Sequence, residues 1–180
     1  MPLNRSLAVM VILTVAASGS VLAQAHEHKQ GPLTVVHPWS RATAPSQKAG
    51  GVFLRIRNDS NQPDRLIGVE SDRADVASLH ALIRDGDVMR MRPVQGGIEV
   101  PANGEVVLAP GGKHVMLIGL RAQLIKESSI PLTLIFERAG RVEIVAVVEA
   151  AGSRGPSGAG AQPAATIGHG QHGAPVHTGK

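Results

Sequence analysis

The sequence predicts an all-β protein, folded as an antiparallel β-sandwich or barrel. Short β-branched or alternating segments, nine or so in number, follow one another from Leu33 to Ala150. Turn sequences rich in Gly and Pro separate them at near-regular spacing. No long segment shows the 3.6-residue period of an amphipathic helix. Such a succession of short strands is typical of β-sandwiches and barrels.

The first three expected strands occupy residues 33–37 (LTVVH), 52–57 (VFLRIR) and 65–71 (RLIGVES). In the second strand, Val52, Leu54 and Ile56 recur at every second position, so they share one face. This strand ends at the turn cluster Asn58-Asp59-Ser60-Asn61, because short polar side chains favour turns.

The remaining expected strands continue in the same pattern to the end of the domain. They occupy residues 76–83, 88–94, 96–100, 105–110, 114–120, 132–138 and 142–150. Asp85-Gly86 predicts a tight turn between the first two of these, and Ala139-Gly140 predicts a hairpin between the last two. We therefore expect one β-domain over residues 33–150.

The N-terminal 25 residues have the features of a secretory signal peptide. Arg5 supplies the positive charge, residues 7–17 (LAVMVILTVAA) the apolar stretch, and Ala23 or Ala25 the cleavage site. The apolar stretch is too short to span a bilayer. We expect a periplasmic protein with a short segment, residues 26–32, before the domain. Because the chain has no Cys, we expect no lipoprotein anchor.

The sequence changes character at residue 151. Residues 151–180 contain eight Gly and three Pro and no apolar periodicity. Such a segment cannot offset the entropy of ordering, so we expect a disordered C-terminal tail. It carries His169, His172 and His177, which could bind Cu(II) through imidazole nitrogen. A neutral linker is the alternative.

Composition excludes several classes of function. Aromatic residues make up only 2% of the chain, and the net charge of +4 comes from scattered basic residues, so a nucleic-acid reader is not expected. The absence of Cys excludes disulfides, thiolate zinc sites and Cys-centred blue-copper sites.

Histidine and methionine gather in one window, residues 80–116. Of the five Met residues, Met1 and Met10 lie in the leader, and the other three lie in this window beside two His. Thioether and imidazole together favour Cu(I), whereas zinc sites do not use thioether. Two residues apart on a strand, two side chains share a face. Residues 114 and 116 are therefore expected to share one face of a strand, and so are residues 89 and 91. The candidate ligands are His80, His114, Met116 and either Met89 or Met91.

The alternative is a metal-free β-sandwich in which the methionines fill the core and His80 is a buried, hydrogen-bonded residue. We favour the ligand interpretation because the mature chain has no methionine elsewhere.

Two stretches of the chain resemble a known family. HPWSRATAPSQKAGGVFLRIRN and LHALIRDGDVMRMRPVQGGIEVPANGEVVLAPGGKHVMLIGL are similar to the periplasmic Cu(A)-type copper chaperones, and the resemblance runs from Leu33 to Glu149. It implies a cupredoxin-like β-sandwich whose Cu(I) ligands are His80, Met91, His114 and Met116. Relatives often carry another His or Met after the first ligand, where this chain has Leu82 and Arg84.

The resemblance also implies a function and a partner. The protein would not be an enzyme but would deliver Cu(I) to the Cu(A) domain of cytochrome c oxidase subunit II, or to a Sco-type assembly protein. A periplasmic copper buffer without a dedicated acceptor is the first alternative. A copper monooxygenase with an N-terminal His26 is the second, although the chain lacks the aromatic surface such enzymes use. Cleavage after Ala23 makes His26 the third residue, whereas cleavage after Ala25 makes His26 the first residue and His28 the third. In either case we expect an auxiliary Cu(II) site at the new N-terminus.

Overall fold

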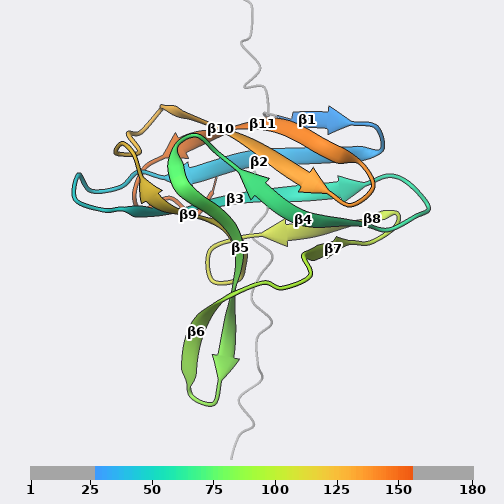
Figure 1. Ribbon diagram of the computed structural model, residues 1–180, viewed down its shortest axis with the longest axis horizontal. Helices are drawn as coiled ribbons and strands as arrows, with labels where there is room; N and C mark the ends of the chain where they lie inside the picture. The colour runs from blue at the N-terminus through green and yellow to red at the C-terminus, as the bar shows by residue number, and fades with distance from the viewer. Residues whose placement is uncertain (1–26, 156–180) are drawn as a thin grey trace, which may run out of the picture.

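The computed structural model describes residues 27–155, which form eleven β-strands (Figure 1). The strands are β1 (Glu27–Gln30), β2 (Leu33–Arg41), β3 (Ala49–Asn58), β4 (Asp64–Glu70), β5 (Ala74–Asp85), β6 (Val88–Pro93), β7 (Ile98–Val100), β8 (Gly104–Leu108), β9 (Lys113–Leu120), β10 (Ser129–Phe136) and β11 (Gly140–Glu149). The all-β prediction is confirmed. Among these residues there is no helix long and apolar enough to cross a membrane.

The strands follow the order β6-β5-β9-β3-β2-β11-β10-β4-β7, with β1 added to β2 and β8 added to β3. β3 takes part in two ladders on one side, because its first half pairs with β9 and its second half with β8. Every pairing is antiparallel except that of β2 with β11, which is parallel. The sheet thus folds over into a β-sandwich.

The core lies between the layers and is built from alternate residues of the strands. In β10, for example, Ile130, Leu132, Leu134 and Phe136 are buried, while none of the three residues between them is. Burying a side chain of this size contributes about 1.5–3 kcal/mol, so the period-2 pattern fixes which face of each strand turns inward.

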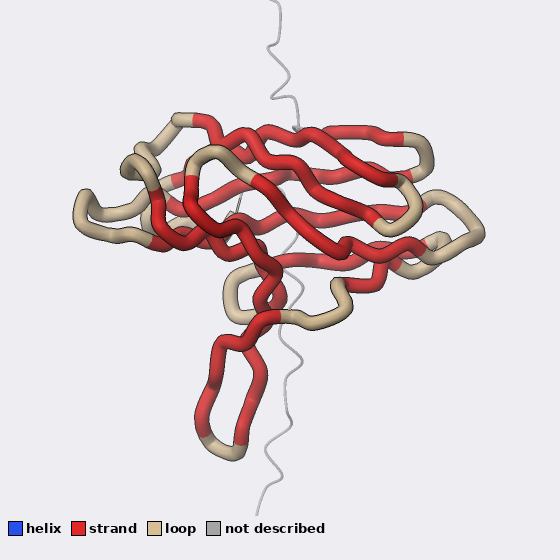
Figure 2. The backbone as a smooth tube through the Cα atoms, in the orientation of Figure 1, coloured by secondary structure: helices blue, strands red, loops and turns tan. Residues whose placement is uncertain are grey.

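One hairpin leaves this body. β5 begins in the core with Ala74 and Leu79, but its last three residues, 83–85, are exposed, and so are all six residues of β6. Figures 1 and 2 show the end of β5 and β6 projecting from the sandwich. Gly86 has a positive φ of 63°, as the expected Asp85-Gly86 turn requires.

Two features at the N-terminal edge were not expected from the sequence. β1 adds residues 27–30 to the sheet beside β2. β2 itself continues past His37 to Arg41, after an irregularity between Val36 and Trp39 where His37 has a φ of 48°. This irregularity places Trp39 opposite Phe53 of β3.

Candidate metal centre

The two histidines of the window meet across neighbouring strands. His80 of β5 pairs directly with His114 of β9, and their ring centres are 6.2 Å apart. The next pair on the same side is Ser78 with Met116. Directly opposed residues of an antiparallel pair project to one face, so both imidazoles and the Met116 thioether share a face.

This face is the outer one. Along β5 and β9 the intervening residues Leu79, Val115 and Leu117 are buried in the core. Because side chains alternate along a strand, His80, His114 and Met116 point away from the core. The prediction that positions 114 and 116 share a face on one strand is confirmed.

The methionines of β6 extend the same face along the hairpin. His80 pairs with Pro93, the next row on this face joins Leu82 to Met91, and the following row joins Arg84 to Met89. Diagonal neighbours in such a ladder lie roughly 7–8 Å apart at Cα, within reach of long side chains. Met91 is therefore the diagonal neighbour of His80, and Met89 lies one row further out.

His114 is held in one orientation. Its side chain is only 6% exposed, and its Nδ1 lies 3.0 Å from the carbonyl oxygen of Gly112 in the preceding turn. A carbonyl only accepts, so Nδ1 carries the hydrogen, and Nε2 keeps its lone pair. Fixing one ring nitrogen through a backbone carbonyl is the usual arrangement for a metal-binding imidazole.

His80 differs from His114 in its hydrogen bonding. Its Nδ1 is buried and has no hydrogen-bond partner among the described residues. Burial, and secondly the neighbouring His114, lowers the pKa of His80 below 6.5. A neutral imidazole with a buried, unpaired nitrogen fits a metal ion, since that ion would supply the missing partner.

The exposed fraction of the four candidate ligands rises from β9 to β6. His114 is buried, Met116 and His80 are half-buried, and Met91 is 48% exposed. Over residues 27–155, no three His, Cys, Asp or Glu side chains gather where they could hold a metal. A metal centre at His80 and His114 therefore depends on thioether ligands.

Aromatic side chains adjoin the histidines on the other side. The Phe53 ring centre is 6.2 Å from that of His114, and the Trp39 ring centre is 4.8 Å from that of Phe53. Sequence reasoning missed this cluster, because the alternation of β3 marks only Val52, Leu54 and Ile56 as its buried face. Phe53 and Trp39 shield the centre from one side.

The chain is similar to known proteins over most of its described residues. Residues 33–148 match the LpqE-like family, described as "Putative lipoprotein LpqE-like". A solved structure, the "Copper-bound PCuAC domain from PmoF2", is 32% identical, with a TM-score of 0.59, and the match covers 69% of this chain and 98% of that one. The chain belongs to the periplasmic Cu(A)-type (PCuAC) copper chaperone family.

The chain is also similar to a second solved structure and to a curated lipoprotein. The "Solution structure of CuI-DR1885 from Deinococcus Radiodurans" is 26% identical, with a TM-score of 0.53, and the match covers 71% of this chain and 81% of that one. The "Putative lipoprotein Lxx21020" of Leifsonia xyli subsp. xyli is 31% identical over 98 residues, which is 54% of this chain. That match covers only 58% of the Leifsonia protein.

The auxiliary Cu(II) ligands predicted for this PCuAC chain are His26, His28, His169, His172 and His177. His26, His169, His172 and His177 lie outside the described residues, as do the expected signal peptide and most of the expected tail. His28 lies in β1, where its Nε2 accepts a hydrogen bond of 3.2 Å from the backbone N–H of Val145. It borders a surface cavity of about 580 Å³ that also includes Glu70 and Arg141 and none of the residues of the predicted Cu(I) site.

Proposed function

We propose that this protein is an exported, periplasmic copper chaperone that carries one Cu(I) on His80, Met91, His114 and Met116. The observation that supports this most strongly is the register of β6, β5 and β9, which gathers these four residues on one outer face. The names of the relatives, copper-bound domains and lipoproteins, support a copper cargo and export.

The donor set suits Cu(I). Two imidazoles and two thioethers are neutral, so the complex keeps a single positive charge, and the soft sulfurs favour Cu(I) over Cu(II). The lowered pKa of His80 keeps its imidazole neutral near pH 7, and the hydrogen bond to Gly112 leaves Nε2 of His114 for the metal.

We propose that this site transfers copper by ligand exchange and does not act as a catalyst. Met91 is 48% exposed on the edge strand of the projecting hairpin, so an incoming ligand can approach from that side while His114 stays fixed. We propose that the acceptor is the Cu(A) domain of cytochrome c oxidase subunit II or a Sco-type protein, whose thiolates bind Cu(I) more strongly than thioethers.

Transfer kinetics separate this proposal from a copper buffer. The Cu(I)-loaded protein is mixed with an apo Cu(A) domain at increasing concentration. A chaperone hands copper over within a complex, so the transfer rate rises with acceptor concentration. A buffer releases copper first, so the rate levels off at its dissociation rate and is the same for a small-molecule chelator. The latter result would reject the chaperone role.

We also retain a second, weaker Cu(II) equivalent as part of the proposal. Its ligands would be His26 or His28 at the mature N-terminus, or His169, His172 and His177 in the tail. In β1 the His28 ring already accepts the Val145 hydrogen bond, which an N-terminal Cu(II) site built on His28 would have to displace. The tail is therefore a better candidate than His28.

A further inference from the structure

Arg41, the last residue of β2, lies on the same outer face as the proposed copper ligands. Ser40 pairs with Val52, and Gly51 pairs with Met116. Arg41, Gly51 and Met116 therefore follow one row across β2, β3 and β9. Since Gly51 has no side chain, the Phe53 ring leans into its place; a Cβ there would come within 3.0 Å of that ring.

The Arg41 guanidinium is held above this aromatic surface. Its central carbon is 5.9 Å from the centre of the Phe53 ring and 6.0 Å from that of Trp39. The Phe53 ring is in turn 6.2 Å from that of His114. The positive charge thus lies no more than about 12 Å from the His114 ring, a distance at which a partly buried charge still acts on a metal ion.

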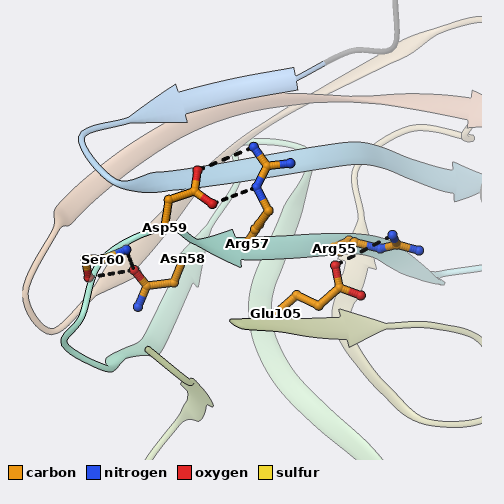
Figure 3. Close-up of polar contacts among 6 residues, drawn as sticks. All are labelled: Arg55, Arg57, Asn58, Asp59, Ser60 and Glu105. Carbon is orange, nitrogen blue, oxygen red and sulfur yellow. Dashed lines mark hydrogen bonds and ion pairs between the residues drawn. The ribbon is translucent and has the colours of Figure 1, made fainter. Parts of the chain in front are cut away.

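No carboxylate within residues 27–155 forms an ion pair with this charge. Arg41 is half-buried, its Nε donates a 2.8 Å hydrogen bond to the carbonyl oxygen of Ser153, and none of the ion pairs within residues 27–155 includes it. The residues outside that range contain no Asp or Glu. By contrast, Figure 3 shows Arg55 paired with Glu105 and Arg57 paired with Asp59.

The nearest acid by register is Glu149, which pairs with Arg41 from β11. β11 lies on the side of β2 away from β3 and β9, so Glu149 is one strand further from the centre than Arg41. Its negative charge opposes that of Arg41 only in part, because the Coulomb energy falls with distance.

We propose that Arg41 sets the oxidation-state preference of the site, favouring Cu(I) over Cu(II). This inference rests on the proposed function. A fixed positive charge repels Cu(II), with charge +2, more strongly than Cu(I), with charge +1. It thereby raises the reduction potential of the bound couple and keeps the cargo in the form that thiolates accept. Arg41 does this through space, as a specificity-determining residue and not a ligand.

The test compares charge variants by measuring both copper affinities and the reduction potential. One unit charge at about 12 Å and an effective dielectric constant near 20 corresponds to roughly a tenfold change in an equilibrium constant. At low ionic strength, Arg41→Gln should therefore raise the Cu(II)/Cu(I) affinity ratio about tenfold. For a one-electron couple this lowers the potential by about 59 mV. Arg41→Lys should stay close to the unmodified protein.

Two further variants test whether the direction of the shift in reduction potential follows the sign of the charge removed. Glu149→Gln removes the opposing charge, so it should raise the potential, and by less than Arg41→Gln lowers it. Arg57→Gln removes an arginine that an acid already pairs, at the far end of β3, and should leave the potential unchanged. Salt should shrink the Arg41 and Glu149 shifts, since it screens partly exposed charges.

The outcomes separate electrostatics from packing. If Arg41→Gln does not fold, Arg41→Met keeps the aliphatic contact with the rings and should show the same shift. A folded Arg41→Gln or Arg41→Met with unchanged potential overturns the proposal, and so does Arg41→Lys behaving like Arg41→Gln. Failure of the unmodified protein to bind Cu(I) would instead reject the proposed function itself.

Discussion

At the scale of single residues, His114 and Met91 mark the two ends of the proposed site. His114 is 6% exposed and hydrogen-bonded to Gly112, whereas Met91 is 48% exposed on an edge strand. A buried, oriented ligand retains the metal, and an exposed ligand exchanges it. We therefore expect His114 to retain the copper and the side of Met91 to be open for transfer.

Met89 and Met91 offer a matched pair of substitutions. Both thioethers are on the same strand, on the same face and about half exposed, but only Met91 lies one row from His80. Met91→Leu should weaken Cu(I) binding by at least the roughly tenfold that outer-shell changes cause at metal sites. Met89→Leu should leave the affinity intact. Competition with a chromophoric Cu(I) chelator measures both, and the reverse result would move the ligand to Met89.

At the scale of elements, β5 joins the core to the site. Leu79 is buried in the core, its neighbour His80 faces outward, and Ile83 on the projecting end is 46% exposed. The strand is therefore anchored at one end and free at the other.

The free energy of unfolding should therefore depend more on the core end of β5 than on its projecting end. Leu79→Ala should lower the free energy of unfolding by about 2–5 kcal/mol, since it leaves a cavity in the core. Ile83→Ala should change it by only about 0.5 kcal/mol, as expected for an exposed site. Urea unfolding of the copper-free protein measures both values. Equal losses would show that the hairpin packs against the body.

Local sequence patterns predicted most of these elements but not all. The strands with alternating apolar residues, such as β10, and the turns at Asp85-Gly86 and Ala139-Gly140 are as expected. β1 (EHKQ) carries no apolar alternation, so only its pairing with β2 defines it. The parallel contact of β2 with β11 joins residues over one hundred positions apart, which no local pattern encodes.

At the scale of the whole molecule, the C-terminal chain meets the site before it leaves the described region. Gly155 lies against the Trp39 ring, and Ser153 accepts the Arg41 hydrogen bond. The described part of the chain therefore ends beside the aromatic cluster. The candidate ligands could be chosen from the sequence, because residue type carries their chemistry. The cluster of Trp39, Phe53 and Arg41 could not, since it depends on the register between β2 and β3.

Removal of residues 156–180 tests the role of the tail. We expect the truncated protein to keep its Cu(I) affinity, because the proposed ligands all lie in β5, β6 and β9. It should lose the weaker Cu(II) equivalent assigned to His169, His172 and His177. Parallel Cu(II) titrations of the full-length and truncated proteins measure this capacity. Equal capacity would show that the tail is a linker only.

The central claim is that histidine and methionine together hold Cu(I) on the outer face of β5, β6 and β9. X-ray absorption spectroscopy of the Cu(I)-loaded protein tests it most directly, because sulfur and nitrogen neighbours differ in distance and scattering. We predict mixed ligation by two sulfur and two nitrogen atoms, with the sulfur contribution reduced in Met91→Leu and unchanged in Met89→Leu. A spectrum with nitrogen and oxygen neighbours only would contradict the account.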